Sequence, residues 1–178
     1  MLFSEHSRQG LTSTLERCAR STLVRSENAV CQIALEPAGT VLRGDPLVVI
    51  TTTSFAFRLL TMFHVDDTEA NRAYFVPTGS TLTLQEGFAE FANLCCGALN
   101  RELSPLYPHL AMSIPCTLRA QCIEHLPQLK PEYTSHFTVT IDDSVKVGVT
   151  LCMCCSAAVE IPVQLNTVQQ TSGELEMF

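Results

Sequence analysis

Apolar side chains recur about every 3.6 residues in two stretches of the chain, a spacing typical of amphipathic helices. In the first stretch, near the amino terminus, the shared apolar face consists of Leu11, Leu15, Cys18, Ala19 and Leu23. The second stretch covers residues 81–103. Ser80 or Thr81 is available to cap its amino end, and Ser104-Pro105 stops it. The pattern therefore predicts two long helices.

Alternating apolar and polar residues predict four strands, at residues 31–36, 112–118, 137–141 and 145–153. A continuous apolar run at residues 46–52 predicts one more strand, which is buried. Residues 54–65 fit a helical face and an alternating strand equally well. The polar segment 66–80 is predicted to be a loop, and Asp142-Asp143-Ser144 is typical of a hairpin turn between the last two strands.

The predicted elements follow the order helix, strands, helix, strands. This order indicates the α+β class: a mostly antiparallel sheet with two long helices packed on it, and an internal pseudo-repeat. No clear linker divides the chain, so residues 1–163 are predicted to form a single domain. Residues 164–178 are predicted to be a polar tail, from which Leu175 and Phe178 could dock.

Charge and hydropathy limit the classes of partner. The formal net charge is −7 and no run of basic residues occurs. Nucleic acid is therefore not expected as a partner, because sequence-blind binding depends on Lys and Arg neutralising phosphates. The apolar runs fall well short of the roughly 18 residues that span a bilayer, so no membrane partner is expected. The amino terminus lacks a basic region followed by an apolar block, which makes the cytoplasm the expected compartment.

Nine cysteines raise the question of a metal or redox site. An odd number at irregular spacings, without an export signal, favours small buried hydrophobes in a reducing compartment. Only Cys152-Met153-Cys154-Cys155 invites a metal interpretation, but the cluster lacks a second ligand pair and a nearby histidine. The sequence therefore predicts core cysteines and no metal site.

The second helix presents a polar stripe when its residues are placed at 100° intervals. Relative to Glu86, Glu90 falls at about 40°, Asn93 at about −20° and Gly97 at about 20°. The opposite face is apolar and consists of Leu84, Phe88, Phe91, Cys95 and Leu99. A glycine in mid-helix costs about 1 kcal/mol relative to alanine, so Gly97 suggests that another group approaches closely. The alternative is an ordinary solvated face, with Gly97 packed against a strand.

The spacing of these residues resembles a known motif. Glu86-x3-Glu90-x2-Asn93, followed after 21 residues by Pro115, is similar to the signature of the CheC, CheX and FliY chemotaxis phosphatases. The run Glu90-Phe91-Ala92-Asn93-Leu94-Cys95-Cys96-Gly97 also resembles the family's helix, in which glycine follows asparagine by one turn. One departure is Glu86, since Asp or Ser is usual at the first position.

The resemblance implies a protein substrate, the aspartyl phosphate of a phosphorylated CheY-like receiver. Asn93 would orient the attacking water, and Glu90 would pair with a receiver lysine. Glu86 and Gly97 would lie at the contact, and Pro115 would shape the start of an edge strand. The receiver would supply Mg²⁺, so no cofactor of the chain's own is expected. A non-catalytic receiver-binding adaptor or a dimerising scaffold of the same fold is the alternative, and a homodimer is left open.

An internal duplication would give the first helix a segment equivalent to the motif. The corresponding run is Glu16-Arg17-Cys18-Ala19, with alanine at the asparagine position and Val41 at the proline position. This pairing predicts a single active face, as in the CheX branch of the family.

Overall fold

The computed structural model describes residues 2–26, 28–37, 40, 42, 44–45 and 47–163. Within them it contains a seven-stranded antiparallel sheet and four helices, which confirms the α+β class. The helices are α1 (Glu5–Leu23), α2 (Glu69–Phe75), α3 (Leu84–Leu103) and the 3-10 helix η1 (Ala120–Leu129). The strands are β1 (Cys31–Leu35), β2 (Leu47–Thr53), β3 (Phe57–His64), β4 (Ala111–Met112), β5 (Cys116–Leu118), β6 (Tyr133–Ile141) and β7 (Val145–Cys155).

The strand order across the sheet is β1-β6-β7-β3-β2-β4, with β5 also paired to β2. The two central strands, β3 and β7, each close a hairpin, β2–β3 in one half of the chain and β6–β7 in the other. At the edges, β1 pairs with a strand of the second half, and β4 and β5 pair with a strand of the first. Each half begins with a long helix, α1 or α3. This arrangement is that of an internal pseudo-repeat whose halves exchange edge strands.

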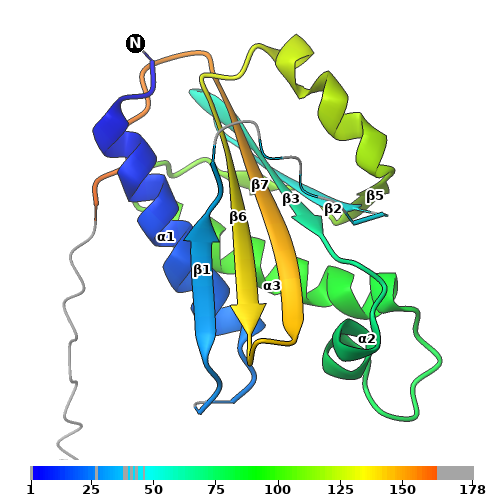
Figure 1. Ribbon diagram of the computed structural model, residues 1–178. Helices are drawn as coiled ribbons and strands as arrows, with labels where there is room; N and C mark the ends of the chain where they lie inside the picture. The colour runs from blue at the N-terminus through cyan, green and yellow to red at the C-terminus, as the bar shows by residue number, and fades with distance from the viewer. Residues whose placement is uncertain are drawn as a thin grey trace, which may run out of the picture.

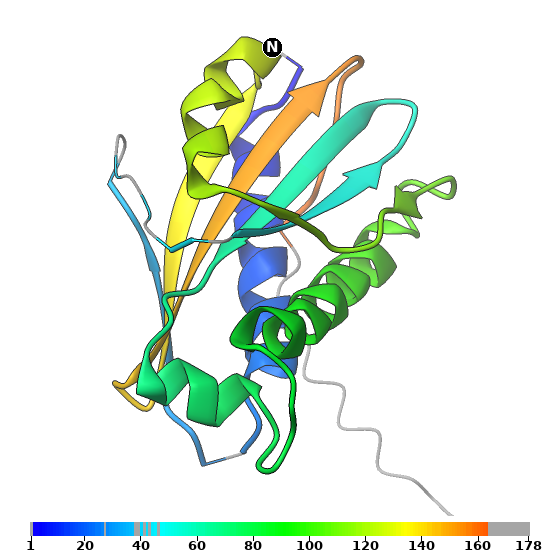
Figure 2. The same ribbon diagram turned by 90° about the vertical axis from the view of Figure 1, so that its right-hand side faces the viewer.

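Helices lie on both faces of the sheet (Figures 1 and 2). α1 and α3 pack against each other on one face, where Phe63, Phe88 and Phe137 are completely buried in the main core. η1 lies on the opposite face from α1, and its Leu126 packs in a smaller cluster with Met62 (Figure 2). The two long helices on an antiparallel sheet are thus as predicted, whereas η1 was not expected.

Two short helices occupy segments for which the sequence predicts other structure. The loop predicted at residues 66–80 contains α2, capped by Thr68, whose hydroxyl accepts a hydrogen bond from the Asn71 N–H at 3.2 Å. α2 has only seven residues, too few to establish a helical period. η1 contains Pro127 and has no side-chain cap, so it carries no helix signal. Residues 54–65, ambiguous by pattern, contain β3, which is paired on both sides.

The predicted hairpin between β6 and β7 is confirmed. Asp142 and Asp143 have φ values of 48° and 57°, in the left-handed region that aspartate tolerates better than most residues. Two such residues in succession match the twist of the flanking strands.

The cysteines divide between core and surface. The core interpretation is confirmed for four that are buried, Cys18, Cys95, Cys96 and Cys152. Burial raises the pKa of Cys18 to about 11 and that of Cys95 to about 12, so both thiols stay protonated near neutral pH. The interpretation is wrong for Cys116 and Cys122, which are exposed because β5 is an edge strand and η1 buries only Leu126.

The three clustered cysteines of β7 do not converge. Cys152 and Cys154 pack on the η1 side of the sheet, whereas Cys155 packs against the main core. Within the part of the chain that the structure describes, no group of three or more metal-ligating side chains occurs. No helix among the described residues is long and apolar enough to cross a membrane. The tail predicted at residues 164–178 lies outside the described residues.

Candidate functional site

The motif residues lie on α3, whose two faces differ sharply. Phe88, Cys95 and Leu99 are completely buried. On the other side of the helix, Glu90 is exposed and Asn93 is partly exposed. The predicted polarity of this helix is therefore confirmed.

Glu86 has a structural role at the beginning of α3. The N-cap is Thr83, not Ser80 or Thr81, so the helix begins at Leu84. The Glu86 carboxylate accepts hydrogen bonds of 2.8 Å from both the backbone N–H and the hydroxyl of Thr83. The Thr83 hydroxyl in turn accepts from the Glu86 N–H at 3.2 Å, which completes a capping box. These bonds hold the pKa of Glu86 below its ordinary value of 4.5.

Loss of this capping box is expected to destabilise the fold. Thr83→Ala should lower the free energy of unfolding by about 0.5–2 kcal/mol. Because the folded-state pKa of Glu86 is lowered, its contribution is present above the ordinary carboxyl pKa and is lost as the pH falls through the folded value. Thermal melting of Glu86→Ala and wild type should therefore differ at pH 7 and converge in acid. A difference that persists in acid would contradict the electrostatic part of this role.

Glu90 and Asn93 present unengaged polar groups. Across the described residues, no hydrogen bond or ion pair joins either side chain to another group of the chain. They are one turn apart, since residues separated by three positions are neighbours on a helix surface. A carboxylate and an amide are thus displayed together and are free to bind another molecule.

Gly97 completes the stripe and is not required by packing within the described chain. A Cβ at this position would meet only Nη1 of Arg101, at 3.7 Å, an ordinary contact. Gly87 differs, because a Cβ there would lie 2.6 Å from the Phe75 carbonyl oxygen of α2. Gly87 thus permits α2 to pack on α3, whereas the surface at Gly97 is open to an approaching partner.

Alanine at the two glycines is expected to have opposite effects on stability. Gly97→Ala should raise the free energy of unfolding by about 0.5–1 kcal/mol, because alanine is the better helix former and the space is open. Gly87→Ala should lower it by about 1–3 kcal/mol through overpacking. Urea unfolding measures both. A fall in the free energy of unfolding of Gly97→Ala would contradict the open space at this position.

Pro115 lies at the edge of the sheet. The predicted strand around it is divided into β4 and β5, which pair in succession with β2. The four residue steps from Met112 to Cys116 oppose three steps from Thr52 to Val49, so one extra residue forms a bulge. Pro115 occupies this bulge immediately before β5, a position that tolerates the missing N–H.

The edge segment that holds the bulge lies against α3. The Gln85 side chain donates a hydrogen bond to the Thr117 hydroxyl, and α3 also contacts β4, so helix and edge strand run in opposite directions (Figure 2). Pro115 therefore lies on the edge segment of the sheet that neighbours α3.

Two exposed apolar side chains flank this region, and the sequence pattern did not single them out. Leu94 follows Asn93 on α3 and is 48% exposed. Ile114 precedes Pro115 and is 82% exposed, although the alternating pattern predicts it on an apolar strand face. The bulge turns Ile114 outward, which a sequence period cannot reveal. Exposed apolar groups beside polar ones are typical of protein-binding surfaces.

The pairing of α1 with α3 proposed from sequence is wrong by three residues. Ala19 is only 1% exposed, so it cannot occupy the position equivalent to the outward-facing Asn93. Matching the buried positions instead aligns Gly10 with Gly87 and Cys18 with Cys95. This alignment places Glu16 at the position of Asn93. The conclusion that one helix carries the Glu/Asn pair is unchanged. Val41, which the sequence pairing placed at the proline position, lies outside the described residues.

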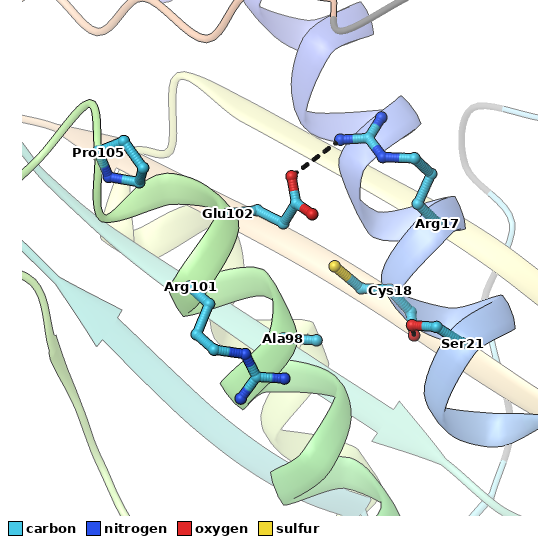
Figure 3. Close-up of a pocket in the computed structure, with 7 residues that line it drawn as sticks. All are labelled: Arg17, Cys18, Ser21, Ala98, Arg101, Glu102 and Pro105. Atoms are coloured by element: carbon cyan, nitrogen blue, oxygen red, sulfur yellow. Dashed lines mark hydrogen bonds and ion pairs between the residues drawn. The ribbon is translucent and has the colours of Figure 1, made fainter. Parts of the chain in front are cut away.

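A hollow of about 500 Å³ opens between α1 and α3 (Figure 3). Nη2 of Arg17 and Oε2 of Glu102 lie 3.2 Å apart across it and join the two helices. Cys18 also lines it, but its raised pKa makes it a poor nucleophile. Arg101 points away from the Arg17–Glu102 pair and runs back along α3 (Figure 3). The hollow itself shows no catalytic constellation.

Solved structures with similar folds support the resemblance noted in the sequence. The structure is similar to the CheX–CheY–BeF3–Mg²⁺ complex from Borrelia burgdorferi, with a TM-score of 0.57 and 12% identity over 83% of this chain and 97% of that one. It is similar to CheX from Vibrio vulnificus, with a TM-score of 0.53 and 15% identity over 84% and 99% of the two chains. It is also similar to a CheC-like protein from Shewanella sp. PV-4, with a TM-score of 0.52 and 10% identity over 85% of this chain and 99% of that one.

The chain has the CheX/CheC-like fold. No protein-family model matches the sequence, and no curated protein matches it. At identities of 10–15% the CheX/CheC-like fold alone is established, and the roles of individual residues depend on their own geometry. In this fold Glu90 and Asn93 lie on the outward face of α3, and Pro115 lies in the bulge at the edge of the sheet.

Proposed function

We propose that this protein docks on a phosphorylated CheY-like receiver and hydrolyses its aspartyl phosphate. The observation that carries the proposal is the display of Glu90 and Asn93, one turn apart, on the outward face of α3. Neither side chain has a partner among the described residues. The fold adds support, because one structural neighbour is a CheX solved with CheY, BeF3 and Mg²⁺.

The surface around the pair is suited to a protein partner. Gly97 leaves the helix backbone accessible, Leu94 exposes an apolar side chain next to Asn93 on α3, and Ile114 exposes another at the edge of the sheet. Apolar contacts at the centre of an interface exclude water and strengthen the polar contacts that they surround. An adaptor would use the same surface but would gain little from an unengaged amide at Asn93.

Hydrolysis requires a water in line with the phosphorus and the leaving carboxylate oxygen. The Asn93 side-chain oxygen accepts a hydrogen bond from this water, and the amide NH₂ can donate to a phosphoryl oxygen. The new P–O bond forms as the bond to the receiver aspartate breaks, which releases inorganic phosphate and a free carboxylate. Asn93 thereby contributes by positioning, since an amide takes no proton.

Glu90 has a separate task in this scheme. Its carboxylate pairs with a lysine of the receiver and sets the register in which Asn93 meets the phosphoryl group. The receiver contributes the Mg²⁺ that neutralises phosphoryl charge, so the phosphatase chain needs no cofactor of its own. Both motif side chains therefore act on a site that the receiver largely builds.

The direct test is phosphate release from receivers of the same genome. We expect this protein to accelerate loss of phosphate from at least one phosphorylated receiver in the presence of Mg²⁺, above that receiver's own rate. Radiolabelled or fluorescent phosphate release measures the effect. Tight binding without acceleration would favour the adaptor, and neither binding nor acceleration with any receiver would refute the proposal.

A further inference from the structure

Arg101 is a cation on the same stripe of α3 as the motif residues. It follows Gly97 by one turn, and its side chain runs back along the helix instead of toward Glu102 (Figure 3). Nη1 lies 3.7 Å from the position that a Cβ at Gly97 would occupy. The guanidinium therefore covers part of the open surface above Gly97.

Arg101 also lines the hollow between α1 and α3, but its guanidinium forms no ion pair with the described residues there. Arg17 of α1 is paired with Glu102 at 3.2 Å, but no hydrogen bond or ion pair within the described residues involves the Arg101 side chain. Its N–H donors form a planar fork, which matches phosphoryl and carboxylate oxygens in pairs. An arginine without a partner in a helix stripe is thus available to an anionic ligand.

The position of the guanidinium fits a ligand shared with Asn93. Gly97 and Asn93 are four residues apart, a rise of about 6 Å along the helix axis. A phosphoryl group that accepts hydrogen bonds of about 2.8 Å from each side can bridge a separation of that size. Asn93 and Arg101 can therefore contact one phosphoryl group together.

The negative charge on the outward face of α3 disfavours a phosphoryl ligand unless a cation lies nearby. The chain carries a net charge of −7, and the stripe includes the carboxylates of Glu86 and Glu90. A phosphoryl group approaching two carboxylates is repelled unless a positive charge lies close to its oxygens. Arg101 supplies that charge within the stripe itself.

We propose that Arg101 binds the phosphoryl group of the docked receiver and gives this face its preference for the phosphorylated form. The inference rests on the proposed function, because it takes the receiver to be the partner. It adds a residue that lies outside the Glu-x2-Asn motif and selects the substrate by its charge. Asn93 remains the residue that orients the water.

The test compares affinities for one receiver with and without BeF3 and Mg²⁺, a stable mimic of the phosphoryl group. Arg101→Gln should weaken binding of the BeF3-loaded receiver by about tenfold or more, the range for a hydrogen bond to a charged group. Binding of the unloaded receiver should be unchanged. Arg101→Lys, which keeps the charge but loses the fork, should restore part of the preference.

Arg58→Gln is the matched control. Arg58 is exposed on β3, and its neighbour Leu59 packs in the main core, so the Arg58 side chain lies on the face of the sheet away from α3. Arg58→Gln should bind the BeF3-loaded receiver in preference to the unloaded receiver, to the same extent as the wild type. Circular dichroism should show an intact fold for both glutamine variants, since glutamine is a good helix former at position 101.

The outcomes separate this inference from the proposed function. Equal weakening of both receiver forms, or no weakening, would overturn the role of Arg101. If the wild type still accelerates phosphate release in that case, the proposed function survives. If the wild type neither binds nor dephosphorylates any receiver, both proposals fail.

Discussion

Asn93→Ala is expected to lower kcat for receiver dephosphorylation by about a hundredfold or more. The amide is proposed to hold the water only as the new P–O bond forms, so its loss removes an interaction specific to the transition state. Affinity for the phosphorylated receiver should fall much less than kcat, because Arg101 and Glu90 keep their contacts with the receiver. A fall in kcat at nearly constant affinity is the signature of such a residue.

The effects on kcat and on affinity are separated by measuring single-turnover dephosphorylation and binding to the BeF3-loaded receiver for the same variant. Glu16→Ala is the matched control, because Glu16 of α1 occupies the position equivalent to Asn93 in the pseudo-repeat and should leave turnover unchanged. Asn93→Asp keeps the size of the side chain but brings a negative charge to the phosphoryl group, and should be as slow as alanine. Turnover of Asn93→Ala at the wild-type rate would exclude Asn93 as the residue that orients the water.

Sequence patterns predicted the parts of this fold in which one face of an element is buried. Leu11, Leu15 and Cys18 are all buried on α1, and Phe137 and Val139 alternate correctly on β6. In such elements the period of apolar residues records the burial directly. The polar stripe of α3 was found in the same way, as the remainder of a helix whose other side is core.

The features that escaped prediction depend on contacts between elements. Thr83 is the exception, because its capping box with Glu86 is a local Thr-x-x-Glu spacing that the sequence itself contains and that Ser80 and Thr81 lack. The register between the two halves was set from the short motif alone, although the 3.6-residue pattern already places Ala19 on the apolar face of the first helix. Ile114 is exposed through a bulge opposite β2, and Arg101 is distinguished only by where its side chain turns.

Glu90→Ala is expected to act on docking more than on chemistry. Its carboxylate is proposed to pair with a receiver lysine, and Leu94, one turn further along α3 and 48% exposed, would help to exclude water once the receiver covers it. Truncation of one partner of a desolvated pair costs about 2–5 kcal/mol, so affinity for the BeF3-loaded receiver should fall by a corresponding factor. Glu86→Ala should cost much less affinity, because the Glu86 carboxylate is occupied by Thr83.

A double-mutant cycle isolates the pair from indirect effects. Glu90→Gln, which keeps the size of the side chain and removes its charge, is combined with replacement of the receiver lysine by methionine. If the two groups interact, the double variant should bind about as well as either single variant, with a coupling energy of about 1.5 kcal/mol or more. The coupling should persist in high salt, since a desolvated pair is screened far less than an exposed one. Additive losses would show that Glu90 does not contact that lysine, and equal losses for Glu86→Ala and Glu90→Ala would assign the effect to the general negative charge of α3.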